Sequence, residues 1–162
     1  MMAPMIRLDP MTAAEFTRYL EAAIPAYAQA HVQAGDCVPE EAVERAKDDY
    51  DNLLPLGLLT PDNHLCSIRA DAISEPVGMI WFSLKQSRWG KSAYIYDFLV
   101  YEAARGKGYG SQTLRALEAL LAAQGVTRLS LNVMAWNHRA KALYERMGFG
   151  VAGIGMTKVV RQ

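Results

Sequence analysis

Three glycines at alternate positions in the stretch Arg105-Gly106-Lys107-Gly108-Tyr109-Gly110-Ser111 separate an apolar segment from a helical pattern. The preceding segment, AYIYDFLV, is rich in aromatic and branched residues, which favour a β-strand. Residues 109–124 have helical periodicity, and TRLSLNVMA after them has the composition of a further strand. A strand, a glycine turn, a helix and a strand form a βαβ unit, whose strands are parallel and whose crossover is right-handed. The sequence therefore predicts an α/β domain.

The remaining elements follow from the same kind of pattern. A short strand at residues 5–8 precedes helices near residues 12–35 and 39–54, the second with Pro39 in its first turn. NHLCSIRAD and EPVGMIWFSLKQ are typical of an antiparallel strand pair, NHRAKALYERMG of a helix, and FGVAGIGMTKVV of one or two final strands. A chain of 162 residues suits one domain, which we expect to span residues 1–162 around a mixed sheet.

Charge and cysteine content exclude several classes of protein. Seventeen basic and seventeen acidic residues give a net charge of zero, without the electrostatic footprint of a nucleic-acid or membrane-surface protein. Cys37 and Cys66 do not have the spacing of metal ligands, and the first residues lack the apolar run of a secretion signal. We expect a reduced, cytoplasmic protein with no metal, no nucleic-acid partner and no membrane association.

The glycine turn has the composition of a phosphate cradle. Glycines let consecutive backbone N–H groups converge on one point, and the N-terminus of the following helix adds further donors and a positive dipole end. Arg105 and Lys107 supply positive charge. The alternative is a tight turn with solvated basic side chains. The triphosphate pattern GxxxxGK[ST] is missing, and the GxGxG spacing does not fit a dinucleotide fingerprint.

Two motifs together make the sequence resemble the GNAT acetyltransferase superfamily. Arg105, Gly108 and Gly110 fill the family's acetyl-CoA signature, [Q/R]-x-x-G-x-[G/A]. Downstream, LNVMAWNHRAKALYERMGF resembles the family's strand, Asn, helix, Tyr and Gly-Phe segment, so the resemblance covers roughly residues 64–160. The chain departs from the common pattern at Glu102, where many relatives have proline, and at Ala104, where a bulkier residue is usual. Neither change touches the phosphate cradle.

The resemblance implies a fold, a reaction and a binding site. The fold would be a three-layer α/β domain with a mixed, mostly antiparallel sheet, a central parallel strand pair and flanking helices. The reaction would move the acetyl group of acetyl-CoA directly to a primary amine of a small molecule or peptide, without a metal. A V-shaped gap between the parallel strands would hold the pantetheine arm. The residues expected to bind acetyl-CoA are Leu99 and Val100 through their main chain, the cradle Arg105, Gly106, Lys107, Gly108, Tyr109, Gly110 and Ser111, and then Asn137 and Tyr144.

Two residues are candidates for proton transfer. Tyr144 lies two helical turns after Asn137 and would donate a proton or a hydrogen bond to the departing thiolate, whose pKa is about 8.5. The alternatives are that Tyr144 packs in the core and that Asn137 caps its helix. Asp97, the acidic residue on the central strand, would take the amine's proton directly or through water. Its alternative is a structural hydrogen bond.

The acceptor side is less defined by sequence. In relatives it is built by the first two helices and by strand ends, and Tyr94 and Tyr96 are candidates for lining it. Acidic residues and a histidine near the helices would attract a cationic amine or form a solvated helix end; they are His31, Asp36, Glu40 and Glu41. Large aromatic residues would add surface, although such residues usually lie in the core; they are Trp81, Phe82, Trp89 and Trp136. His138 has no partner in sequence that would indicate catalysis.

Two other functions fit the same motifs. The chain could be a catalytically silent acyl-CoA sensor or interaction module, because the cradle alone serves binding. It could also acetylate protein N-termini or lysines, which would require an open acceptor groove. The final segment GMTKVV is one that could pair across subunits, so the sequence leaves monomer and homodimer open.

Overall fold

The computed structural model describes residues 5–161, which form two compact units. The first unit combines residues 5–12 with 61–149 and contains the sheet and the glycine turn. The second combines residues 13–60 with 150–161 and contains α1 (Ala13–Ala34) and α2 (Pro39–Leu53). Both helices begin and end close to the predicted residues. None of the described helices is long and apolar enough to span a membrane.

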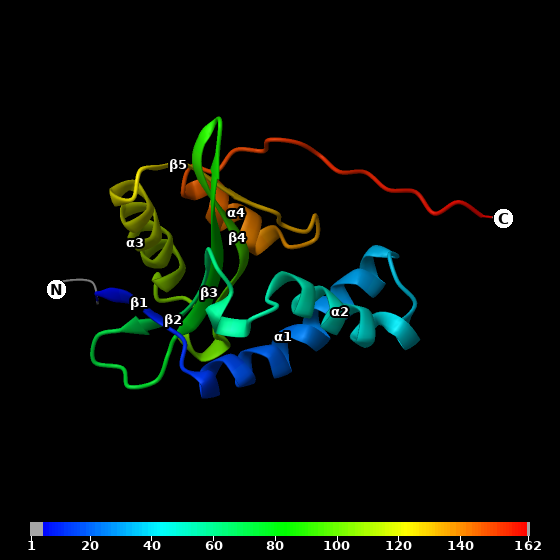
Figure 1. The fold of residues 1–162 in the computed structure, drawn as a ribbon, viewed down its shortest axis with the longest axis horizontal. Helices are drawn as coiled ribbons and strands as arrows, with labels where there is room; N and C mark the ends of the chain where they lie inside the picture. The colour runs from blue at the N-terminus through cyan, green and yellow to red at the C-terminus, as the bar shows by residue number, and fades with distance from the viewer. Residues whose placement is uncertain (1–4, 162) are drawn as a thin grey trace. The chain divides into compact units, whose positions relative to one another are not determined.

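A five-stranded mixed sheet forms the centre of the first unit (Figure 1). Its strands follow chain order: β1 (Ile6–Pro10), β2 (Asn63–Ala70), β3 (Gly78–Ser87), β4 (Gly90–Val100) and β5 (Val126–Leu131). Each of the strands β1 to β4 pairs antiparallel with the next one of these four. Strands β4 and β5 are parallel, as the βαβ pattern predicted. The α/β class and the mixed, mostly antiparallel sheet are therefore confirmed.

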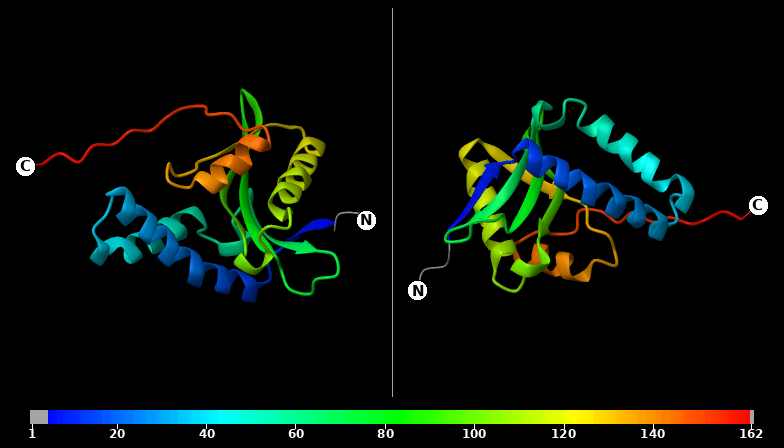
Figure 2. Two further views of the ribbon diagram at one scale, coloured as in Figure 1. Left: turned by 180° about the vertical axis from the view of Figure 1, so that it is seen from behind. Right: turned by 90° about the horizontal axis from the view of Figure 1, so that it is seen from below.

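The main core lies between this sheet and α3 (Tyr109–Ala123). Leu114, Leu117 and Leu121 recur at helical spacing on α3 and are buried against alternate residues of β3 and β4. The short helix α4 (His138–Arg146) adds Leu143 and Tyr144 at the margin of the same cluster. Figure 2 shows α3 and α4 from two further sides of the sheet. In the second unit, α1 and α2 have a separate small core of alanines.

The final strands predicted at FGVAGIGMTKVV do not form. Residues 149–161 have neither helix nor strand, and residues 150–161 are exposed. A strand requires a neighbour for its backbone groups, and no described strand pairs with this segment. The glycines at 150, 153 and 155 further weaken its strand preference. Among the described strands, the parallel pair consequently lies at one edge of the sheet.

Candidate active site

The parallel strands β4 and β5 separate partway along β4. Their pairing ends at Ile95 and Leu131, while β4 continues to Val100 with β3 as its only neighbour among the described strands. Residues 96–100 thus have no strand neighbour on the β5 side, a condition that the expected V-shaped gap would also need. Leu99 is exposed there, and Val100 is half-buried against the core. We call the end of the β4–β5 pairing, together with residues 96–100, the fork.

A β-bulge near the fork alters which side chains face it. Trp81 of β3 pairs with Asp97, whereas the next residue, Phe82, pairs with Ile95, so Tyr96 has no counterpart on β3. A bulge inserts one unpaired residue and bends its strand. As a result Asp97 lies on the same sheet face as Trp81, opposite the face that packs on α3. No local sequence signal marks this bulge, because it depends on the register between two strands.

Gly78 holds β3 close to the end of β4. A β-carbon at this position would collide with the Leu99 carbonyl oxygen and would lie 3.1 Å from both Ile68 Cδ1 and Val100 Cα. Only glycine fits this close approach. Gly78 therefore fixes the stretch of β4 that borders the fork, and sequence analysis did not single it out.

The glycine turn forms an exposed connection into α3. Gly106 and Gly108 have positive φ angles of 77° and 80°, which favour glycine, and Gly108 is the N-cap of α3 without any side-chain cap. The first N–H groups of the helix are thus left to an external acceptor. A β-carbon on Gly106 would have nothing within 4 Å, whereas one on Gly110 would lie 3.0 Å from Leu143 Cδ2. Gly106 borders open space, and Gly110 packs against α4.

The side chains of the turn differ in what they face. Arg105 and Lys107 are exposed, and Arg105 Nε donates to the Val100 carbonyl oxygen at 3.1 Å, which ties the turn to the end of β4. Ser111 is half-buried. Tyr109 is buried in the core, so only its backbone is available at the turn. The exposed backbone, the positive side chains and the uncapped helix fit the diphosphate of a coenzyme A thioester.

Tyr144 lies beside the part of β4 that β5 does not cover. Its ring centroid is 6.5 Å from that of Phe98 and 5.6 Å from that of Phe149, and the side chain is half-buried. Burial, with a smaller contribution from the negative charge of Asp97, raises the pKa of Tyr144 to about 12. The two residues proposed for proton transfer are therefore electrostatically coupled, and Tyr144 stays protonated at neutral pH.

Asn137 caps α4. Its Oδ1 accepts from the Ala140 backbone N–H at 3.2 Å, so the structural alternative for this residue is correct. The cap uses only the oxygen, and the side-chain NH₂ group of the exposed Asn137 is not part of it. His138, the first residue of α4, is exposed.

An aromatic cluster occupies the face of β4 on which Asp97 lies. Tyr96 stacks on Trp81 at 4.6 Å between centroids and meets Tyr94 edge-on at 4.9 Å. Burial, followed by the neighbouring Tyr96, raises the pKa of Tyr94, while a hydrogen bond with the Asn132 backbone lowers it. Trp81 and Phe82 are core residues as expected, but Trp89 is exposed at the β3–β4 hairpin and stacks under Arg88.

The acidic and histidine candidates lie in the second unit. His31 Nδ1 and an Asp36 carboxylate oxygen are 3.0 Å apart, and both line a pocket of about 390 Å³ between α1 and α2. Glu40 and Glu41 are exposed in the first turn of α2 and do not line this pocket.

Cys66 is buried in the first unit, and burial raises the pKa of its thiol to about 11. Among residues 5–161 no cluster of side chains has the composition of a metal site.

Comparison with known proteins agrees with this geometry. The Acetyltransferase (GNAT) family matches residues 20–149. The uncharacterized N-acetyltransferase YycN of Bacillus subtilis (strain 168) is 40% identical over 94% of this chain and 97% of its own length. The crystal structure of YycN has a TM-score of 0.89 at 39% identity and covers 97% of this chain and 99% of that one. The thialysine N-epsilon-acetyltransferase of Bos taurus is 35% identical over 44% of this chain and 41% of its own length.

A matching family over most of the sequence, a fold shared with YycN and a glycine cradle beside a forked parallel pair lead to one conclusion. The chain belongs to the GNAT family of acetyltransferases.

Proposed function

We propose that this protein is a cytoplasmic, single-domain N-acetyltransferase that moves the acetyl group of acetyl-CoA directly to a primary amine of a small molecule or peptide. The observation that carries the proposal is the exposed glycine cradle at the uncapped end of α3, next to the fork. The name of the bovine relative refers to acetylation of an ε-amine, which supports an amine acceptor. Acetyl-CoA supplies a thioester whose acyl carbon is open to attack by an amine.

The cradle and the fork would bind the two parts of the coenzyme. The N–H groups of residues 105–111 would hold the diphosphate, with Arg105 and Lys107 balancing its charge. The main-chain groups of Leu99 and Val100, which have no β5 neighbour, would bind the pantetheine arm as an added strand. The NH₂ group of Asn137 adds a donor from the start of α4.

Asp97 would act as the general base, and Tyr144 would donate a hydrogen bond to the leaving group. Asp97 takes the proton that the amine loses, directly or through water, as the new N–C bond forms. Tyr144 donates a hydrogen bond to the sulfur as the C–S bond breaks. Its pKa of about 12 lies well above that of a thiol, so hydrogen bonding is favoured over complete proton transfer.

The electrostatic coupling of Asp97 and Tyr144 links deprotonation of the amine to departure of the thiolate. When Asp97 is protonated by the amine, its negative charge no longer raises the pKa of Tyr144. Tyr144 then becomes a stronger acid at the moment when the sulfur carries negative charge. We propose direct transfer without a thiol nucleophile. Burial raises the pKa of the Cys66 thiol, which disfavours the reactive thiolate. Cys37 belongs to the second unit and is distant from Asp97 and Tyr144 in sequence.

Thermal unfolding with acetyl-CoA, compared with ATP and NADH at equal concentration, tests the binding step. Ligand at one hundred times its dissociation constant should stabilise the protein by about 2.7 kcal/mol. A shift with acetyl-CoA alone, followed by thiol release with amines, is the expected result. No shift at saturation would refute the proposal, and a shift without turnover for any amine would favour a silent acyl-CoA sensor. Competition among peptides, polyamines and amino acids would then separate a small-molecule enzyme from a protein acetyltransferase.

Two glycine variants test whether acetyl-CoA binds at the glycine turn. Gly106 and Gly125 have φ angles of 77° and 76°, and both have open space where a β-carbon would be, but Gly125 lies at the other end of α3. Replacing either by Ala should cost roughly 1 kcal/mol of stability through backbone strain. Only Gly106→Ala, which places a methyl group in the cradle, should also weaken acetyl-CoA binding. Equal affinity in the two variants would move the diphosphate site elsewhere.

A further inference from the structure

We propose that Asn63 and Trp81 are positioning residues of the acetyltransferase, because they hold the bulge at Tyr96 and thereby set the place of Asp97 on β4. The role in the reaction rests on the proposed function, whereas the hold on the bulge does not. Asn63 belongs to β2 and Trp81 to β3, so both act from the antiparallel part of the first unit, outside the glycine turn and the fork.

The bulge deprives Tyr96 of support from the neighbouring strands. Tyr96 has no counterpart on β3, and the pairing of β4 with β5 ends one residue earlier, at Ile95. A residue inserted by a bulge is left unpaired and disrupts the ladder locally. The next residue is Asp97, the proposed general base, which must keep a fixed position relative to the amine. The side chain of Tyr96 must therefore supply the support that backbone pairing does not.

The ring of Tyr96 stacks on the indole of Trp81. Their centroids are 4.6 Å apart, and the two ring planes are only 21° from parallel. Trp81 is also the residue of β3 that pairs with Asp97. Tyr96 is exposed, whereas only 2% of the Trp81 surface is. One buried indole thus lies beside both residues, and its orientation determines where they are held.

A hydrogen bond to Asn63 fixes the orientation of that indole. Trp81 Nε1–H donates to Asn63 Oδ1 at 2.8 Å, and Asn63 Nδ2 donates to the Pro61 carbonyl oxygen at 3.1 Å. An indole N–H can only donate, so the amide oxygen of Asn63 must face it, and the bond to Pro61 holds the amide in that direction. Asn63 shares a sheet face with Trp81, because Leu65, two residues after Asn63, is the β2 partner of Trp81. The two hydrogen bonds and the stack thus connect the start of β2 to the bulge.

Asn63→Leu tests the hold on the bulge without any substrate. Leucine has a similar length and branching but leaves the buried indole N–H without this acceptor, so the ring should turn and release Tyr96. NMR relaxation should show the backbone order parameters of Tyr96 and Asp97 falling from about 0.85 toward about 0.6, while Leu117 in α3 stays rigid. A loss of overall stability alone would not produce this local change. Unchanged order at Tyr96 and Asp97 would overturn the proposal.

Steady-state kinetics tests the role of Asn63 in the reaction. In Asn63→Leu the kcat/KM for the amine should fall about 10-fold or more, the scale of a misplaced catalytic group, while the dissociation constant of acetyl-CoA stays within about twofold. Asn63→Asp retains an acceptor oxygen and should keep kcat/KM within about threefold of the unaltered protein. Gln86→Leu removes an exposed amide that donates to the Ser87 carbonyl oxygen; it is the matched control and should change neither quantity.

Tyr96→Leu is a second variant, which removes the stack at an exposed position where folding should tolerate the change. It should lower the order parameter of Asp97 as Asn63→Leu does. Three results would contradict the proposal: a rigid Asp97 in Tyr96→Leu, an unchanged kcat/KM in Asn63→Leu, or an Asn63→Asp variant as impaired as Asn63→Leu. If the unaltered protein acetylates no amine, the proposed function fails, whereas the relaxation measurement still decides whether Asn63 holds the bulge.

Discussion

Tyr144 is the residue whose environment decides most about the proposed chemistry. It is half-buried, lies beside Phe98, and has its pKa raised by burial and by the charge of Asp97. Neither influence can be read from the sequence, which shows only that Tyr144 follows Asn137 by two helical turns. A tyrosine that remains protonated is a constant hydrogen-bond donor, which suits a group that meets a thiolate.

Tyr144→Phe should lower kcat by about 100-fold, the scale of a lost proton donor, while the affinity for acetyl-CoA changes little. Steady-state kinetics and calorimetric titration measure the two quantities separately. Tyr19→Phe, which alters a buried tyrosine of the second unit, is the control and should retain full activity. Equal kcat for Tyr144→Phe and the unaltered protein would mean that Tyr144 only packs.

Asp97→Asn should lower the pKa of Tyr144, because it removes the negative charge that disfavours tyrosinate. The pKa should remain above the usual value of 10, since burial, the larger cause, is unchanged. NMR of tyrosine labelled at Cζ, assigned with Tyr144→Phe, follows this titration without substrate. If Asp97 is also the base, the acid limb of the kcat/KM profile should disappear in this variant. An unchanged Tyr144 pKa would disprove the coupling.

At the scale of elements, the sequence predicted the helices and the βαβ unit well because their signals are local. Pro39 sets the start of α2, and the glycines after residue 105 and at 125 bracket α3. The bulge at Tyr96, the close approach at Gly78 and the end of pairing at Leu131 depend on strand register, which no local pattern reveals. The predicted final strands were wrong, because residues 150–161 contain three glycines and have no described strand to pair with.

Gly78→Ala should destabilise the protein by about 3 kcal/mol, since its methyl group would collide with the Leu99 carbonyl of the neighbouring strand. Urea denaturation measures the loss. Gly153→Ala, where a β-carbon would meet nothing within 4 Å, is the control and should change stability by less than about 0.5 kcal/mol. Similar stability for both variants would show that β3 can move away from β4 at little cost.

Thr113→Val should stabilise α3 by about 1 kcal/mol. The Thr113 hydroxyl is buried beneath the helix and has no hydrogen-bond partner among the described residues, so it loses hydration without compensation. Valine has nearly the same shape and removes that polar group. Thermal unfolding measures the gain, and a loss of stability would indicate that the hydroxyl has a partner in solution.

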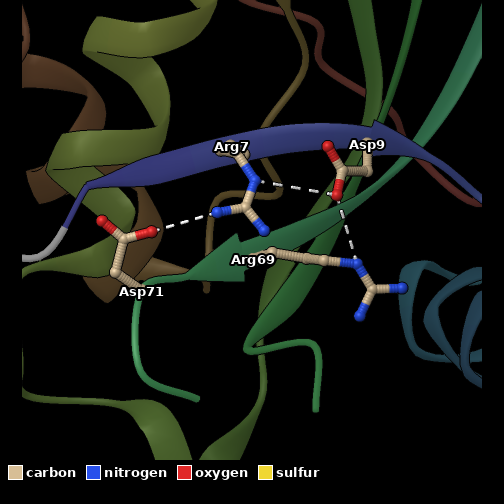
Figure 3. Close-up of polar contacts among 4 residues, drawn as sticks. All are labelled: Arg7, Asp9, Arg69 and Asp71. Atoms are coloured by element: carbon tan, nitrogen blue, oxygen red, sulfur yellow. Dashed lines mark hydrogen bonds and ion pairs between the residues drawn. The ribbon is translucent and has the colours of Figure 1, made fainter. Parts of the chain in front are cut away.

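At the scale of the whole molecule, the β1 edge of the sheet carries two ion pairs, Arg7 with Asp71 at 3.0 Å and Asp9 with Arg69 at 3.4 Å (Figure 3). Replacing both Arg7 and Asp9 by Val would remove the ion pairs of β1 and leave an apolar edge beside Pro10. An apolar edge without charges should then pair with other copies, and light scattering should detect species larger than those of the unaltered protein. The conservative double variant, Arg7→Lys combined with Asp9→Glu, keeps both charges and should behave as the unaltered protein. No increase in size would mean that Pro10 alone protects the edge.

The fork also bears on how long the protein survives in a cell. Residues 96–100 of β4 have a strand neighbour on one side only among the described strands, and backbone exposed in this way opens more readily than backbone paired on both sides. A ligand that completes the strand would close this point. If that ligand is acetyl-CoA, as proposed, the protein should be degraded more slowly when acetyl-CoA is plentiful, and its abundance should rise with the supply.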